Sequence, residues 1–281
     1  ELYFNLETDE EVMTEYEYDL NNRLVSESID DFDYESTTHK YSSVKYYYDK
    51  NGNMTARQGI NREPLENEAS LAGRSADTGL ELYRYDAFNR LSKYYSGSTE
   101  SSYTYSADNL RHDKVVNNNR TEYVWNGQNL ASETSGGNIN TYTYDATGVY
   151  IANQNGTVSS YLKDNHGNVI GKTDATGTMM QAASELKGYD AYGNLRTGAA
   201  PDPFGYCGEY YDNETGLIYL RNRYYAPSIG RFISEDSHWN VDNMIYGDEK
   251  YVEHEVKIPN VNAILQSSNL YAYCGNNPVK C

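Results

Sequence analysis

Alternating tyrosines followed by a polar turn recur along most of the chain. The repeated unit reads Tyr-x-Tyr-Asp, then two residues, then Gly or Asn, a polar residue and an apolar one. Clear copies begin at Tyr16, Tyr46, Tyr83 and Tyr142, and looser copies at Tyr103, Tyr123, Tyr161 and Lys187. Their fourth positions are separated by 30, 37, 20, 20, 19, 19 and 26 residues. A period of about twenty residues, lengthened by insertions, is typical of a repeat protein.

Each copy predicts one β-hairpin. The Tyr-x-Tyr alternation places both rings on one face of a strand. The Asp then accepts backbone N–H groups in an Asx-turn, and Gly or Asn supplies the left-handed residue that the reversal needs. We assign these turns to Asp19, Asp49, Gly52, Asp86, Asp145, Gly148, Asp164, Gly167, Asp190 and Gly193. Isolated hairpins are marginally stable, so we expect successive hairpins to stack into a continuous sheet.

Two stretches interrupt the period. Residues 57–80 are expected to form an inserted loop with one helical turn, and residues 237–268 form the second insertion. Within the latter, residues 261–266 predict a short helix. The chain starts within the repeat pattern and has no evident cap, so we expect a fragment of a longer array.

Tyrosine dominates the apolar content. The chain has 281 residues, 31 of them tyrosine, and only 38% are hydrophobic even with tyrosine included. Aliphatic residues are too few for a conventional core, so tyrosine rings must supply much of the buried area. Cys207, Cys274 and Cys281 are odd in number and widely spaced, which fits neither a disulfide scaffold nor a Cys-x-x-Cys metal site.

The charge is strongly acidic, with 41 Asp and Glu against 23 Lys and Arg and a net charge of −18. This argues against direct nucleic-acid binding, which needs a basic face. Solubility is the ordinary explanation of such acidity, and a basic cargo is the alternative. The N-terminus shows no signal peptide, and no run approaches the roughly eighteen apolar residues of a membrane span.

No motif requires catalysis or a cofactor. The Asp-x-x-Gly groups at Asp49, Asp145, Asp164, Asp174 and Asp190 lack the further oxygen ligands of a calcium loop, and we interpret them as turns. Gly171-Lys172-Thr173 lacks the earlier glycine of a phosphate loop. The five histidines have no metal-ligand spacing. We therefore predict no catalytic, cofactor-binding or metal-binding residues.

The C-terminal third carries a different set of strings. It contains Leu220-Arg221-Asn222-Arg223-Tyr224-Tyr225, then Gly230-Arg231-Phe232-Ile233-Ser234, and later Asn269-Leu270-Tyr271-Ala272-Tyr273. These strings closely resemble the RHS-repeat-associated core domain of bacterial RHS/YD-repeat proteins, and the upstream units resemble the YD repeats of that family. The resemblance covers nearly the whole chain apart from the two insertions.

The resemblance implies an architecture and a function. In this family a strip of YD repeats spirals into a hollow shell, which the core domain plugs or lines, and the shell encloses a variable C-terminal toxin. Self-cleavage before the toxin resembles aspartyl-protease chemistry at repeated Asp-Pro-x-Gly motifs downstream of Asn-Asn-Pro-Val. This chain stops at Lys280-Cys281, before that motif, and we interpret the upstream Asp202-Pro203-Phe204-Gly205 as a turn.

The residues that carry the core resemblance are predicted to be structural. They are Arg221, Arg223, Tyr224, Tyr225, Gly230, Arg231 and Phe232. We expect the three arginines to pair with Asp212, Glu235 or Asp236, or to stack on tyrosines.

The sequence thus predicts an all-β chain, with a YD-repeat hairpin array over residues 1–200 and an RHS core domain over residues 201–281. The array is expected to form a curled sheet or part of a hollow shell. Its predicted function is non-catalytic containment or presentation of a toxin, with that toxin segment and upstream repeats as partners. The alternatives are a surface adhesion or glycan-binding module and part of a self-cleaving protease whose aspartates lie downstream. The resemblance to Gram-positive members indicates a secreted or wall-associated bacterial product.

Overall fold

A computed structural model describes residues 2–5, 10–33, 38–59, 79–199, 202–240, 242–248 and 259–280. Strands β1 to β15 pair antiparallel in chain order in one sheet, β16 and β17 form a second, and β18 to β21 form a third. The all-β hairpin array predicted from the sequence is confirmed.

The strands of the large sheet have the following bounds: β1 Leu2–Asn5, β2 Glu10–Tyr18, β3 Leu24–Asp33, β4 Thr38–Tyr48, β5 Met54–Gly59, β6 Leu80–Tyr85, β7 Leu91–Ser96, β8 Thr99–Tyr105, β9 Arg111–Val116, β10 Asn119–Asn126, β11 Asn129–Ser135, β12 Asn138–Asp145, β13 Gly148–Gln154, β14 Thr157–Lys163 and β15 Val169–Asp174. The remaining strands are β16 Gly188–Tyr189, β17 Leu195–Thr197, β18 Tyr210–Asp212, β19 Leu217–Leu220, β20 Arg223–Ala226 and β21 Arg231–Phe232. The helices are η2 Ala183–Glu185, η3 Tyr206–Gly208, η4 Pro227–Ile229, α1 Val261–Ser267, η5 Cys274–Asn276 and η6 Pro278–Lys280.

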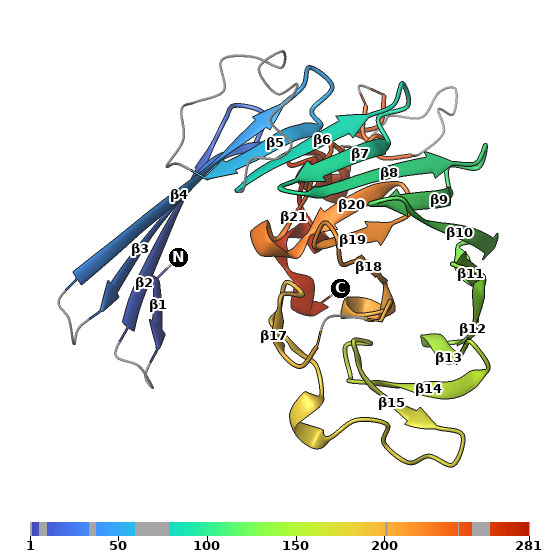
Figure 1. Cartoon of the computed structure of the whole chain (residues 1–281). Helices are drawn as coiled ribbons and strands as arrows, with labels where there is room; N and C mark the ends of the chain where they lie inside the picture. Colours follow the sequence, from blue (N-terminus) through green and yellow to red (C-terminus); the bar gives the residue numbers. More distant parts are fainter. Residues whose placement is uncertain are drawn as a thin grey trace. The chain divides into compact units, whose positions relative to one another are not determined.

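The chain divides into two compact units. Unit 1 comprises Glu1–Asn89, Lys93–Glu100 and Ser234–Tyr271, and unit 2 comprises Arg90–Ser92, Ser101–Ile233 and Ala272–Cys281. Within unit 2, β9 to β15 follow a curve and the four-stranded sheet β18–β21 lies on its inner side (Figure 1). The predicted division of the chain at residue 200 stays a prediction.

A β-bulge lies at the same place in successive hairpins. The pairing register shifts just before the second aromatic residue of the motif, for example before Tyr18, Tyr48 and Tyr105. In the first copy, Tyr18 pairs with Leu24 and Glu17 pairs with Ser26, so the outgoing strand holds one extra residue. A bulge bends its strand and increases the local twist. The repeated bulge therefore offers a cause for the curvature of the strip.

Where the fourth position of the motif is an aspartate, its side chain closes the turn. The Asp49 carboxylate accepts the backbone N–H of Asn51 and of Asn53, both at 2.9 Å. Asp164 and Asp190 make the same pair of bonds in their own turns. Gly52 has a φ of +78°, the left-handed conformation that the reversal needs.

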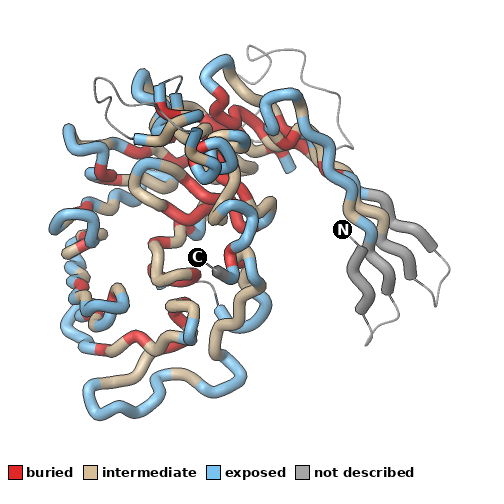
Figure 2. Tube along the Cα trace, turned by 180° about the vertical axis from the view of Figure 1, so that it is seen from behind, coloured by how far each residue is buried: buried red, intermediate tan, exposed pale blue. Residues whose placement is uncertain are grey.

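Aromatic rings and one aliphatic residue per repeat form the core of the strip. The first ring of the motif is buried at Tyr46, Tyr83, Tyr103, Tyr123, Tyr142 and Tyr161. The aliphatic residue that follows the turn is buried at Leu24, Met54, Leu91, Leu130, Val149 and Val169. Figure 2 shows buried and exposed residues succeeding one another along the strands of unit 2. Tyrosine thus supplies buried area that the scarce aliphatic residues do not.

The second ring of the motif links each hairpin to the one before it. The Tyr48 hydroxyl donates to the Leu24 carbonyl at 3.0 Å, and Tyr85 donates to Met54 at 2.9 Å. Tyr105 likewise donates to Leu91 at 2.7 Å. Each acceptor is the carbonyl of the buried residue after the previous turn, so this ring-to-carbonyl bond satisfies a hydroxyl and a carbonyl together.

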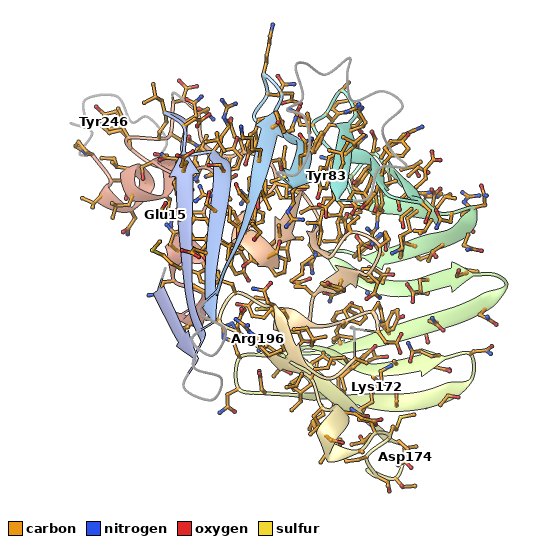
Figure 3. The ribbon with its side chains drawn as sticks, turned by 60° about the vertical axis from the view of Figure 1, so that its left-hand side comes forward. Glu15, Tyr83, Lys172, Asp174, Arg196 and Tyr246 are labelled. Carbon is orange, nitrogen blue, oxygen red and sulfur yellow. The ribbon has the colours of Figure 1, made fainter. Side chains whose placement is uncertain are left out.

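The far edge of β15 is covered by chain that is not a strand of the sheet. The amides of Met180 and Lys187 donate to carbonyls of Lys172 and Ile170, at 3.0 and 2.9 Å. A Cβ on Gly171 would lie 2.0 Å from the Gln181 side chain, so a larger residue there would have to displace the side chains of this segment. The eighth copy of the motif therefore forms the separate hairpin β16–β17. Figure 3 labels Lys172, Asp174 and Arg196 at this end of unit 2.

The two predicted insertions differ in how far the structure describes them. Residues 57–59 continue β5 and residue 80 begins β6, so the predicted loop is shorter than expected, and residues 60–78 lie outside the described residues. The helix predicted at residues 261–266 is confirmed as α1, with the Asn260 side chain accepting from the Ala263 amide. In the described part of the chain, no helix combines the length and apolar character needed to cross a membrane.

The four-stranded sheet has its own aromatic core. Tyr206, Ile218, Tyr225 and Phe232 are buried together. The Tyr225 ring stacks on Tyr273, with centroids 4.1 Å apart. Gly230 has a φ of +63°, and a Cβ there would lie 2.9 Å from the Tyr192 ring. Of the residues that carry the core resemblance, Tyr225 and Phe232 thus lie in this core, and Gly230 lies against the Tyr192 ring.

Candidate docking site of the C-terminal sheet

In one repeat, the position that pairs with the second ring of the motif is a cation instead of an aliphatic residue, although the preceding Leu110 is aliphatic and buried. In the fourth copy this position is Arg111, at the start of β9, and its side chain is fully buried. Its backbone carbonyl still accepts a hydrogen bond from the second ring of the next repeat, here from Trp125 Nε1 at 2.7 Å. A buried cation at a position built for a hydrocarbon side chain is a local inconsistency of the kind that marks functional or specificity-determining sites.

Four tyrosine rings surround the Arg111 guanidinium. Its central carbon lies 4.7 Å from the Tyr123 ring centre and 5.7 Å from that of Tyr103, both on the strip. Tyr219 and Tyr210 belong to the four-stranded sheet β18–β21, here called the C-terminal sheet, and their ring centres lie 4.5 and 5.0 Å from the same carbon. Aromatic faces attract a cation, most strongly where water is excluded. The four rings thus form an aromatic cage around the guanidinium, with two rings from the strip and two from the C-terminal sheet.

Asp212 of β18 balances the charge within the cage. It is fully buried and pairs with Arg111 Nη1, while its other oxygen lies 2.8 Å from Lys114 Nζ. Lys114 also pairs with Glu214 at 3.0 Å. Burial disfavours ionisation of Asp212, but the charges of Arg111 and Lys114 outweigh it and lower the pKa of this carboxyl below 3.8. The cluster is therefore a four-charge network, with two cations on β9 and two anions on the β18–β19 hairpin.

A second contact adjoins the network on the next repeat. The Tyr210 hydroxyl donates to the buried Glu133 carboxylate at 2.8 Å, and Tyr142 donates to its other oxygen at 2.6 Å. The Tyr123 and Tyr210 hydroxyls lie 3.2 Å apart. Glu133 thus receives donors from both the strip and the C-terminal sheet, which ties β18 to β11 and β12.

The arginines predicted from the C-terminal strings lie around this site rather than inside it. Arg221 pairs with Glu209 and donates to the Gln128 carbonyl at 3.1 Å. Arg223 stacks on Phe232, with its guanidinium carbon 3.6 Å from the ring centre, and Arg231 is buried.

Two of the acids predicted as partners for these arginines have other contacts. Asp212 is held by Arg111 and Lys114, and Glu235 accepts from Tyr271 at 3.1 Å. Sequence reasoning missed Arg111 and Lys114, although Arg111 departs visibly from the aliphatic residue of the neighbouring repeats.

A small cavity lies beside the cage. It has a volume of about 80 Å³, and its lining includes Trp125, Tyr144, Phe204, Cys207 and Arg221. Cys207 is a free thiol whose pKa is raised by burial, whereas Cys274 is disulfide-bonded. Among the described residues, no three His, Cys, Asp or Glu side chains are grouped so that they could hold a metal ion.

Comparison with known proteins identifies the family. The model of the family described as Teneurin YD-shell matches residues 4–279. The chain belongs to this YD-shell family. Among solved structures, the YD-shell fold aligns with that of TcdB2-TccC3-Cdc42 at a TM-score of 0.52 and 17% identity, covering 95% of this chain and 15% of the other.

Curated relatives of this YD-shell chain include bacterial toxins. The tRNA3(Ser)-specific nuclease WapA of Bacillus spizizenii is 30% identical over 253 residues, which is 85% of this chain and 9% of that protein. The tRNA nuclease WapA of Bacillus subtilis is 29% identical over the same shares. The double-stranded DNA deaminase toxin A of Burkholderia cenocepacia is 24% identical over 70% of this chain and 15% of its own length. The chain therefore spans about a tenth of the length of the WapA relatives.

Proposed function

We propose that this YD-shell segment is a non-catalytic wall that contains or presents a toxin domain of the same polypeptide. The observation that carries the proposal is the placement of the motif tyrosines. In unit 2, Tyr103, Tyr123 and Tyr142 lie on the face that receives the C-terminal sheet, and all are buried. This face is therefore the inner face of the wall, which the C-terminal sheet covers in this segment, and the placement of the rings suits enclosure rather than outward display.

The opposite face of unit 2 favours a container over a binding module. Its large exposed apolar side chains include Val124, Ile139 and Val158 on β10, β12 and β14. Isolated exposed aliphatic residues are ordinary on a protein surface. An adhesion or glycan-binding module, the second candidate, would instead present clustered aromatic rings outward.

The contacts of Asp202, the one acid in the upstream Asp-Pro-x-Gly string, support a structural role for that residue. The Asp202 carboxylate is engaged by Lys172 at 2.9 Å and by Gln154 at 3.3 Å, and its backbone carbonyl accepts the Tyr161 hydroxyl at 3.3 Å. The Asp-Pro-Phe-Gly string that begins at Asp202 is therefore anchored by these bonds to β13, β14 and β15. Self-cleavage, the third candidate, would need aspartates downstream of this segment.

The acidity of the chain suggests the kind of cargo. A net charge of −18 would favour a basic toxin segment through long-range attraction. The likeness of this chain to relatives named as bacterial toxins supports a secreted or wall-associated product. A wall with reversed charge that retained the cargo equally well would contradict the electrostatic part of the proposal.

The decisive experiment uses the natural reading frame extended past residue 281. Intact masses would be measured before and after a denaturing wash, together with the protease sensitivity of the downstream segment. Containment predicts that the downstream segment co-purifies, resists protease until denaturation and is then released if the chain has been cut. A downstream segment that is degraded at the rate of the denatured control would exclude containment and favour the adhesion module.

A further inference from the structure

A periodic strip offers the C-terminal sheet several similar places to dock. Neighbouring repeats present the same inward elements, a buried first ring and a buried aliphatic residue, such as Tyr123 with Leu130 and Tyr142 with Val149. Tyrosine stacking is tolerant of position, because any such ring can meet another at several angles. Aromatic contacts alone therefore distinguish poorly between one repeat and the next.

The charged residues are not periodic. The position of Arg111 is aliphatic in the adjoining repeats, where it is Leu91 and Leu130. The inward position three residues later is Lys114 in this repeat, but Glu133 and Ala152 in the next two. Of these inward positions, the fourth repeat alone presents two cations together, and they meet the two anions of the β18–β19 hairpin, Asp212 and Glu214.

We propose that Arg111 and Lys114 are positioning residues that select the fourth repeat as the docking place of the C-terminal sheet, by recognising Asp212 and Glu214. A dock one repeat along would bury both anions against Leu130 and Glu133, with no cation to pair them. Leaving a buried charge unpaired is strongly unfavourable, whereas a well-packed apolar replacement of a whole buried pair is often neutral or stabilising. The network therefore acts by excluding wrong positions, which is a recognised use of buried polar groups.

The inference concerns the assembly of the fold and holds whether or not the wall encloses a cargo. It is distinct from a purely stabilising role, because it predicts a change of position rather than only a loss of stability. Adjacent repeats differ by two strands, so a shift of one repeat moves the C-terminal sheet by about 10 Å along the strip.

The test is a distance measurement between nitroxide labels in the full chain. Labels on Val124→Cys, on the exposed face of β10, and on Asn222→Cys, in the exposed turn after β19, would be introduced with Cys207→Ser, which removes the native free thiol. The parent should give one narrow distance by pulsed electron paramagnetic resonance. The exposed Lys93→Thr change serves as a control and should leave that distance unchanged.

Two variants then separate position from stability. The neutral variant combines Arg111→Leu, Lys114→Thr, Asp212→Leu and Glu214→Thr, so no charge of the network remains unpaired. We expect it to fold and to show added distance populations, because the label on Asn222→Cys moves by about 10 Å, the spacing of two strands. A single distance identical to that of the parent would overturn the proposal.

The transplant variant combines Arg111→Leu, Lys114→Glu, Leu130→Arg and Glu133→Lys, which moves the two cations to the next repeat. We expect the main distance to shift to the displaced value. An unchanged distance in the folded transplant contradicts the proposal. Loss of the folded C-terminal sheet in both variants would also contradict it, because the charges would then be required for docking anywhere rather than for the choice of place.

Discussion

At the residue scale, the turn glycines differ in what surrounds them. Gly52 combines a φ of +78° with a neighbour so close that a Cβ would lie 2.3 Å from Glu235 Cδ. The Gly52 carbonyl also accepts the Tyr271 hydroxyl at 2.7 Å. In unit 1, therefore, Glu235 and Tyr271 lie against a repeat turn, and a side chain at Gly52 would have to displace the Glu235 side chain as well as adopt a strained conformation.

Replacing Gly52 with Ala should therefore destabilise the protein more than the same change at Gly97. Gly97 also has a positive φ, +56°, but a Cβ added there would meet nothing within 4 Å beyond its chain neighbours. Urea unfolding should show a loss of about 1–2 kcal/mol for Gly97→Ala from backbone strain. Gly52→Ala should lose a further 1–3 kcal/mol, roughly, from overpacking. Equal losses would show that Glu235 moves aside without cost.

At the element scale, the unit of stability is the contact between one hairpin and the next. The ring-to-carbonyl bond recurs at Tyr48, Tyr85 and Tyr105, and at Trp125 with an indole in place of the phenol. Because Tyr189 still donates to Val169 at 3.2 Å, the bond persists even where the eighth repeat has left the sheet. The bond is therefore a property of the repeat rather than of sheet pairing.

Removing one such hydroxyl tests its contribution. Tyr105→Phe leaves the ring in place but deprives the Leu91 carbonyl of its donor and the Tyr224 hydroxyl of a neighbour 3.1 Å away. We expect a loss of about 1–2 kcal/mol in the free energy of unfolding. Tyr150→Phe, at a tyrosine that is 44% exposed, is the matched control and should change stability by less than about 0.5 kcal/mol. A comparable loss in both variants would show that the bond itself contributes nothing.

The elements were largely predictable, but the contacts between distant elements were not. Period-two tyrosines and Asp-x-x-Gly turns are local signals, so the hairpins and their turns follow from short stretches of sequence. The bulges leave no such signal, because the extra residue is an ordinary one such as Val25. The pairing of Arg111 with Asp212 spans 101 residues, and a sequence without a fold cannot place those two side chains together.

At the scale of the whole molecule, the consequence of a tyrosine-based core is sensitivity to alkali. Burial raises the pKa of Tyr219 to about 12, and it raises the pKa of Tyr210 and Tyr224 well above the ordinary value of 10.0. These rings are neutral in the folded protein, whereas in the unfolded chain they ionise near pH 10. Their contribution to stability is therefore complete below pH 10 and is lost as the pH rises above it.

The protein should accordingly unfold cooperatively in the alkaline range. Each fully buried tyrosine removes about 1.4 kcal/mol of stability per pH unit above 10, so the three rings together remove about 4 kcal/mol per unit. Tyrosinate absorbance, followed together with circular dichroism, should show exposed tyrosines ionising first, while the buried ones ionise only as the β-sheet signal disappears. A Tyr219→Phe variant should unfold at a higher pH if its structure is otherwise retained, because one of the ionising groups is gone. Ionisation of all 31 tyrosines in one phase near pH 10, with an unchanged β-sheet signal, would mean that the rings are reachable by water and do not form the core.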